Sequence, residues 1–225
     1  ATVGLGVAVG TAAMTGSGNL SGDIDAALRG QAVETAFRPV TALARYATED
    51  FENGIAEGWI NGIVSNDDPG FGAILGRFGG SGGDALVSKT WALEGDAAYA
   101  VIAFDLHAID TWDLESVMVY VNETLTSQRS FSTHGYHDGM ETVTNADIPG
   151  ITVTYEPLNE SELGYWQRNN DTSHDQTVRV RIQIADPGDS VTLGLGSTLN
   201  QGVGDESWAI DNVDVTTTDD PALVM

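Results

Sequence analysis

Residues 177–184, TVRVRIQI, alternate strictly between apolar and polar side chains. Consecutive side chains of an extended chain point to opposite sides, so the valines and isoleucines form one face and the arginines and the glutamine form the other. A strand with one buried face and one wet face is typical of an antiparallel sheet that is open to water on one side. This run therefore constrains the fold more than any other part of the sequence.

Five further runs have the pattern of strands: 99–104, 116–121, 151–155, 190–196 and 207–215. Turn-forming clusters such as SNDDPGFG and ADPGD separate them, and no convincing helical pattern interrupts the series. An α/β fold would need helices between its strands. We therefore predict that residues 48–225 form a two-sheet antiparallel sandwich of the jelly-roll type.

Residues 1–47 have a different pattern. The first part, ATVGLGVAVGTAAM, carries no charge, and between Leu20 and Tyr46 apolar residues recur at helical spacing, with a kink expected at Pro39. The expected fold class is therefore mainly β, with an N-terminal α-helical stalk at 1–47 followed by an antiparallel jelly-roll β-sandwich at 48–225. The alternative for Leu20 to Tyr46 is a helix packed on its own domain, and the alternatives for Ala1 to Met14 are a loose anchor and a strand of the same domain.

The charge is unevenly distributed along the chain. The sequence has 33 acidic and 9 basic side chains and a formal net charge of -24, yet residues 1–47 contain as many bases as acids. Nucleic acids and anionic leaflets are recognised through Lys and Arg, so we exclude nucleic acid as a partner. The chain has no cysteine, which excludes disulfides, thiolate zinc sites and thiol catalysis. The acidic excess suits a calcium-rich extracellular setting.

Acidic residues cluster at the start, in the middle and near the end of the predicted sandwich, and calcium prefers carboxylate oxygens. If the first and last strands pair, Glu52 meets Asp211. The apolar phase of the last strand shifts between Ile210 and Val213, which predicts a bulge there. The candidate calcium ligands are Asp50, Glu52, Asp105 and Asp211, with Asp110, Asp113, Glu115 and Asp205 less favoured. The alternative is a solvated acidic surface, and no EF-hand loop pattern is present.

Three segments carry a resemblance to a known class of domains: EDFENGIAEGW at 49–59, FDLHAIDTWDLESVMVYVN at 104–122 and DESWAIDNVDV at 205–215. They resemble the opening, middle and closing strands of calcium-binding, concanavalin-like or carbohydrate-module-like jelly rolls in secreted bacterial proteins. The resemblance implies a structural calcium near Glu52 and Asp211.

The segment ATVGLGVAVGTAAMTGSGNLSGDIDAAL is similar to the hydrophobic stalk of Flp-type (tight-adherence) type IV pilins of marine alphaproteobacteria, although Leu5 stands where that family has an acidic residue. The resemblance implies a helix that is extracted from the inner membrane and packs at the centre of a filament. Small residues let such helices approach closely. The residues expected to contact other copies of the chain are Val3, Leu5, Val7, Val9, Met14, Leu20, Ile24 and Leu28.

Few residues indicate sugar binding or catalysis. Tyr165 and Trp166 lie in a polar, loop-like segment and are candidate stacking platforms for a sugar ring, whereas most tryptophans of a sandwich are expected in its core. The histidines of STHGYHDG are expected in a polar loop rather than at a metal. No H-E-x-x-H, G-x-S-x-G or Walker pattern occurs, so we expect no enzymatic activity. A glycosidase, which needs two suitably placed carboxylates, is the third hypothesis.

The sequence thus predicts a pilin-like structural subunit of an extracellular filament, a cell-surface appendage. The stalk would lie in the fibre core, and the calcium-stabilised sandwich would be displayed outside for adhesion. Its partners would be copies of itself in a helical filament and surface glycans, with membrane contact only before assembly. The alternative is a secreted calcium-dependent carbohydrate-binding module whose first region is a linker or an anchor.

Overall fold

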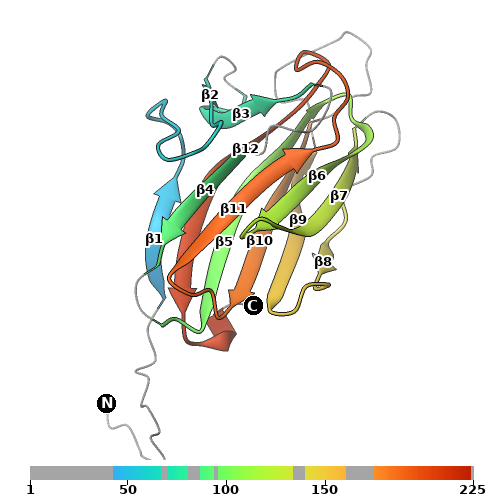
Figure 1. Cartoon of the computed structure of the whole chain (residues 1–225). Helices are drawn as coiled ribbons and strands as arrows, with labels where there is room; N and C mark the ends of the chain where they lie inside the picture. Colours follow the sequence, from blue (N-terminus) through green and yellow to red (C-terminus); the bar gives the residue numbers. More distant parts are fainter. Residues whose placement is uncertain are drawn as a thin grey trace, which may run out of the picture. The chain divides into compact units, whose positions relative to one another are not determined.

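Two antiparallel β-sheets face each other in the computed structural model, which describes residues 43–66, 70–80, 87–93, 96–133, 140–160 and 175–223 (Figure 1). The larger sheet has eight strands: β1 (Ala44–Glu49), β2 (Val64–Ser65), β3 (Ile74–Phe78), β5 (Tyr99–Asp110), β8 (Val143–Asn145), β9 (Ile151–Glu160), β10 (Gln176–Ala185) and β12 (Glu206–Thr218). The smaller sheet has four: β4 (Val87–Ala92), β6 (Asp113–Val121), β7 (Thr124–Ser132) and β11 (Ser190–Ser197). These strands confirm the predicted β-sandwich.

The strand order brings segments that are distant in sequence side by side. The eight-stranded sheet runs β2-β3-β12-β5-β10-β9-β8, and β1 also pairs with β12. The smaller sheet runs β4-β11-β6-β7. The alternating run 177–184 falls within β10, where Val178, Val180 and Ile182 are fully buried while Arg179 and Arg181 keep partial exposure. One wet face and one buried face therefore occur as the sequence predicts.

The expectation of an N-terminal α-helical stalk is wrong. Residues 44–49, which include the end of the predicted stalk, form the strand β1, and β1 pairs with β12 from Ala44 opposite Thr217 to Glu49 opposite Val213. The described residues contain no α-helix, only a 3-10 turn at Pro221–Leu223. Small apolar residues spaced three apart can occur in a helix or in a strand. Here the backbone N–H and C=O groups of residues 44–49 pair with those of β12, which makes the segment a strand. The remainder of the predicted stalk, residues 1–42, lies outside the described residues.

Large aromatic side chains fill the space between the sheets. The bulkiest fully buried side chains include Trp112, Tyr155, Phe104 and Phe131, and Trp208 is 2 % exposed. Burial of such a side chain contributes on the order of 2–3 kcal/mol. The buried indole of Trp112 donates its Nε1–H to the Ser207 carbonyl oxygen at 2.8 Å, so its polar atom is satisfied.

A short segment before β3 covers part of the outer face of the eight-stranded sheet. Phe71 packs on a small cluster formed by Ile74, Ile109 and Ala209, and its ring lies 5.2 Å from the His107 ring in an edge-to-face contact. This contact fixes residues 71–73 close to the middle of β5 and β12. Among the described residues, no helix has the length and hydropathy needed to cross a membrane.

Candidate metal centre

The middle of β12 contains a β-bulge at the place where the sequence predicts one. The register with β5 shifts between Asp211 and Asp214, and Asn212 adopts a left-handed backbone with φ of 52°. The side chain of Asn212 donates to Asp105 Oδ2 at 2.8 Å, and its backbone N–H donates to Asp211 Oδ1 at 2.7 Å. The bulge thus directs two carboxylates of neighbouring strands to the outer face of the sheet.

A turn after β1 brings a further pair of carboxylates to the same place. Phe51, at φ of 53°, buries its ring in the core, so the acidic residues on either side of it are held at the surface. Asp50 Oδ1 accepts a hydrogen bond from the Glu52 backbone N–H at 3.2 Å, and Glu52 Oε1 accepts one from the Ala73 N–H at 3.1 Å. Glu52 therefore spans from the turn to the segment that covers β5 and β12.

The four favoured metal-ligand candidates interact electrostatically at this position, and we call Asp50, Glu52, Asp105 and Asp211 the bulge site. Burial is the main cause that raises the pKa of the Asp211 carboxyl to about 7, and the charges of Asp105, Glu52 and Asp50 raise it further. A hydrogen bond from the Asn212 backbone acts in the opposite direction. These four are the residues selected from the sequence as calcium ligands; the charges of three of them act on Asp211, and their role as ligands stays a prediction.

Positive charge at the bulge site comes from Arg179, whose Nη1 lies 2.8 Å from Asp105 Oδ1. Arg179 donates to one oxygen of Asp105 and Asn212 donates to the other. Both oxygens of Asp105 therefore accept hydrogen bonds from the protein, and the Asn212 bond orients the bulge. Asp211 Oδ2 and Glu52 Oε2 accept no hydrogen bond from the described part of the chain. Among the described residues, no three of these four carboxylates have oxygen atoms that all lie within 4.8 Å of one another. Calcium at the bulge site therefore stays a prediction from the all-oxygen donor set.

A second group of carboxylates lies where the two sheets meet at one end of the sandwich. Within the described ranges, Asp113, Glu115 and Glu206 are the group whose oxygen atoms all lie within 4.8 Å of one another, an arrangement that can hold a metal ion. We call these three residues the cross-sheet triad. Asp113 and Glu115 are among the less favoured ligands predicted from the sequence. Glu206 is not among the predicted ligands, because it meets the other two only where β12 approaches β6.

The members of the cross-sheet triad lie in surroundings that disfavour the ionised carboxylate. Burial is the first cause that raises the pKa of Glu206 to about 7, followed by the charges of Glu115, Asp113 and Asp205. Burial also raises the pKa of Glu115, and a side-chain hydrogen bond with Asp113 adds to that shift.

The other two less favoured ligands have structural partners. Asp110 Oδ2 lies 3.5 Å from Arg77 Nη2, and the Asp205 carboxylate accepts a hydrogen bond from Thr111 Oγ1 at 3.3 Å. Asp110 also has a left-handed backbone with φ of 69°, at the end of β5. Tyr165, Trp166 and the predicted assembly residues lie outside the described residues.

Comparisons with known proteins identify no family. No protein-family model matches the chain, and no match is found among curated protein sequences. The dimeric latent PorU from Porphyromonas gingivalis is similar at a TM-score of 0.44 and 11% identity, over 81% of this chain and 14% of that chain. The CBM22-1 xylan-binding domain from Paenibacillus barcinonensis Xyn10C is similar at a TM-score of 0.42 and 14% identity, over 81% of this chain and 99% of that domain.

Proposed function

We propose that the chain is an extracellular, calcium-stabilised carbohydrate-binding module without catalytic activity, and that it binds neutral glycans on the outer face of its four-stranded sheet. The observation that carries the proposal is that the outward-pointing residues selected below from the four described strands include no charged side chain, although the chain has a net charge of -24.

Strand alternation identifies the residues of this face. Val117, Val119 and Val121 of β6 are buried in the core, so the intervening residues Met118 and Tyr120 lie on the opposite side of the sheet. The same argument applies to β4, β7 and β11. The outward residues, which we call the neutral face, are Ser88, Thr90, Ala92, Ser116, Met118, Tyr120, Leu125, Gln128, Ser130, Thr192, Gly194 and Gly196.

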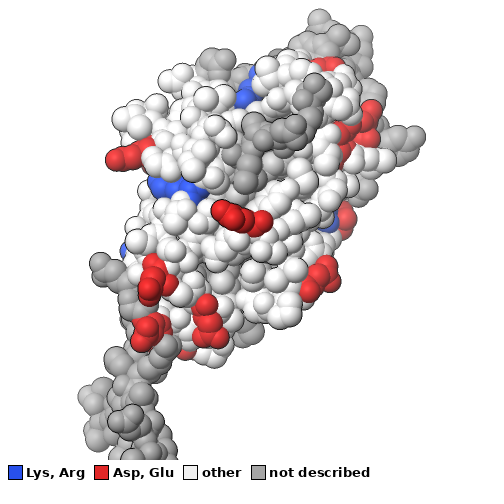
Figure 2. Space-filling view, in the orientation of Figure 1, with Lys and Arg blue, Asp and Glu red and all other residues white. Residues whose placement is uncertain are grey.

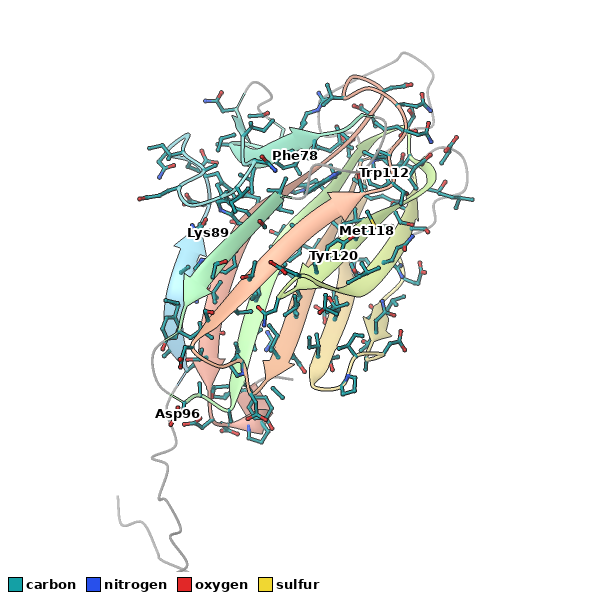
Figure 3. All side chains as sticks on the ribbon, in the orientation of Figure 1. Phe78, Lys89, Asp96, Trp112, Met118 and Tyr120 are labelled. Carbon is teal, nitrogen blue, oxygen red and sulfur yellow. The ribbon has the colours of Figure 1, made fainter. Side chains whose placement is uncertain are left out.

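Glycines of β11 pair with the aromatic residue of the neutral face and with its neighbour on that face. Tyr120 pairs with Gly194 on β11, and Met118 pairs with Gly196. Since glycine has no side chain, the half-buried Tyr120 ring faces no side chain at Gly194, which is itself buried. The Tyr120 hydroxyl contacts Met118 Sδ at 3.4 Å, which holds the two side chains together (Figure 3).

The remaining residues of the neutral face suit a sugar chain. Thr90 and Thr192 share a hydrogen bond between their hydroxyls at 2.7 Å, and Ser130, Gln128 and Thr90 are exposed. Hydroxyl and amide groups can donate and accept hydrogen bonds with sugar hydroxyls, and an aromatic ring can stack on the apolar face of a pyranose. Figure 2 shows a front surface that is mainly white, with one acidic group near its centre and a basic group beside it.

Calcium has a structural role in this proposal. The bulge site lies on the outer face of the eight-stranded sheet, whereas the neutral face belongs to the other sheet. A cation at the bulge site would neutralise Asp211 and Glu52 and fix the turn after β1 without touching the glycan. The filament hypothesis depends on residues 1–42, and no observation on the described residues favours it.

Affinity electrophoresis of the full chain tests the proposal, with soluble xylan, a mixed-linkage β-glucan and the anionic polygalacturonate as probes. We expect retardation by at least one neutral polysaccharide in calcium. Tyr120→Ala and Thr192→Glu should weaken that binding about tenfold, the effect of losing a central contact of 1–2 kcal/mol. Thr152→Glu, on the outer face of the other sheet, is the matched control and should bind like the wild type. Retardation by the anionic polymer alone, or full binding by both variants, would overturn the proposal.

A further inference from the structure

The cross-sheet triad draws its carboxylates from both sheets. Asp113 and Glu115 lie at the start of β6 in the four-stranded sheet, and Glu206 is the first residue of β12 in the eight-stranded sheet. Their oxygens lie within 4.8 Å of one another. Trp112, labelled in Figure 3, precedes Asp113 and donates to the carbonyl of Ser207, so one buried indole ties the backbones of both strands at this point.

Glu206 is the residue that points to a ligand. Its side chain is fully buried, with 0% of its surface exposed. Its Oε1 atom accepts a hydrogen bond from Gln201 Nε2 at 3.0 Å, whereas its Oε2 atom is buried and has no hydrogen-bond partner among the described residues. A buried carboxylate oxygen without a partner is costly in a folded protein, and a bound cation removes that cost.

The neighbouring groups orient the carboxylates but do not neutralise them. Asn200 Nδ2 donates to Glu115 Oε1 at 3.1 Å, and the Asp113 backbone N–H donates to Glu115 Oε2 at 2.8 Å. Of the described basic residues, five form ion pairs with other carboxylates, as Arg77 does with Asp110, and Arg181 donates to the Leu223 carbonyl oxygen. The cross-sheet triad therefore has three acidic groups and no basic side chain of the described chain in contact with it.

We propose that Asp113, Glu115 and Glu206 bind a divalent cation of the hard, oxygen-ligating class, such as calcium, and that this ion joins β6 to β12 at one end of the sandwich. An all-oxygen donor set excludes a preference for soft metals. Calcium accepts carboxylates in variable geometry, so it can bridge two strands that belong to different sheets. This site is separate from the bulge site and does not depend on glycan binding at the neutral face.

Calorimetric titration of calcium into the chelator-treated full chain tests the inference. The wild type is expected to bind one ion at the bulge site and one at the cross-sheet triad. Glu206→Gln, which keeps the shape of the side chain, should lose the second ion and keep the first, whereas Asp211→Asn should do the reverse. Glu123→Gln, in the exposed turn between β6 and β7, is the matched control. Unchanged stoichiometry and affinity in Glu206→Gln would overturn the inference.

A second measurement separates metal binding from a purely structural role of Glu206. In chelator, Glu206→Gln should melt at or above the temperature of the wild type, because the buried acid is gone. In calcium it should melt a few degrees below the wild type, because the ion is lost. A shift of the same sign and size in both conditions overturns the inference. If Glu206→Gln does not fold, Asp113→Asn at the exposed member of the triad should lower the affinity about tenfold or more, and wild-type affinity there refutes the site.

Discussion

Asp211 of β12 and Asp105 of β5 lie directly opposite each other in the antiparallel ladder, and both carboxylates are on the outer face of the eight-stranded sheet. Like charges in directly opposite positions destabilise a sheet. Arg179 compensates Asp105 by an ion pair, while the environment of Asp211 raises its pKa to about 7, chiefly through burial and then through the neighbouring carboxylates. This pair therefore makes the stability of the sandwich depend on what neutralises Asp211.

Asp211→Asn should reverse its effect on stability when calcium is added. In chelator the variant should melt at or above the wild-type temperature, because the substitution removes a half-buried charge that other carboxylates oppose. Binding at one site, with calcium at about 100 times its dissociation constant, adds about 2.7 kcal/mol to the free energy of unfolding. This corresponds to a rise of about 5–10 °C in the melting temperature of a chain of this size, and Asp211→Asn should not show the rise that comes from the bulge site. Differential scanning fluorimetry measures both conditions. Asp147→Asn, at an exposed loop position, is the control, and an undiminished calcium response in Asp211→Asn would contradict the bulge site.

Gly72 leaves room for the Glu52 carboxylate of the bulge site. Its φ is +75°, and a Cβ atom there would lie 2.8 Å from Glu52 Oε1. Gly72→Ala should therefore displace the Glu52 carboxylate and weaken calcium binding about tenfold, as the loss of a supporting contact does. Gly54 is a matched control, because its φ is +74° and a Cβ atom there meets nothing within 4 Å.

Both glycine variants should lose about 1 kcal/mol of stability through backbone strain. Only Gly72→Ala should lose calcium affinity, which calorimetric titration can show. Equal calcium affinity in the two variants would mean that Glu52 is not a ligand.

Much of the sandwich and of the bulge site could be predicted because the relevant signals are local. Alternation in 177–184 specifies a strand with one wet face, which is β10 in the structure. The interrupted apolar phase between Ile210 and Val213 specifies the bulge. β1 and β12 pair, as predicted for the first and last strands, and the charge of Glu52 contributes to the raised pKa of Asp211.

Other features depend on contacts that no local pattern contains. Residues 44–47 have spacing that a helix also satisfies, and only pairing with β12 makes them a strand. Glu206 joins Asp113 and Glu115 across two sheets, so its role cannot be inferred from its own neighbours in sequence. The sequence around Tyr120 does not show that this tyrosine pairs with Gly194, because that pairing depends on the position of β11.

Glycan binding at the neutral face should be almost independent of ionic strength. No residue of this face is charged, so salt has no ion pair to screen there. Raising sodium chloride from about 0.05 M to about 0.5 M should change the dissociation constant for the bound neutral polysaccharide by less than about twofold. Calorimetry at constant calcium measures this value. A steep loss of affinity with salt would show that the ligand is recognised through charges elsewhere on the molecule.

Tyr155 links the two sheets through a polar contact within the core. Its hydroxyl lies 2.9 Å from Ser127 Oγ of β7, and Asn145 Nδ2 donates to the same serine oxygen at 2.7 Å. Burial raises the pKa of Tyr155 to about 12, while the Ser127 hydrogen bond and the Arg129 charge act in the opposite direction. The folded chain thus holds this proton more tightly than the unfolded chain, whose tyrosines titrate near pH 10.

Tyr155→Phe should therefore remove a stabilising contribution that is present at neutral pH and is lost at alkaline pH. Because the folded pKa lies above the unfolded one, the contribution of Tyr155 is full below about pH 10 and is lost as the pH rises towards about 12. At pH 8 the variant should be less stable by about 1 kcal/mol, the value of one hydrogen bond, since Asn145 still satisfies Ser127. Urea denaturation from pH 7 to pH 11 should show parallel stability curves up to about pH 9 that converge above it. Curves that stay parallel to pH 11 would show that Tyr155 ionises equally in both states.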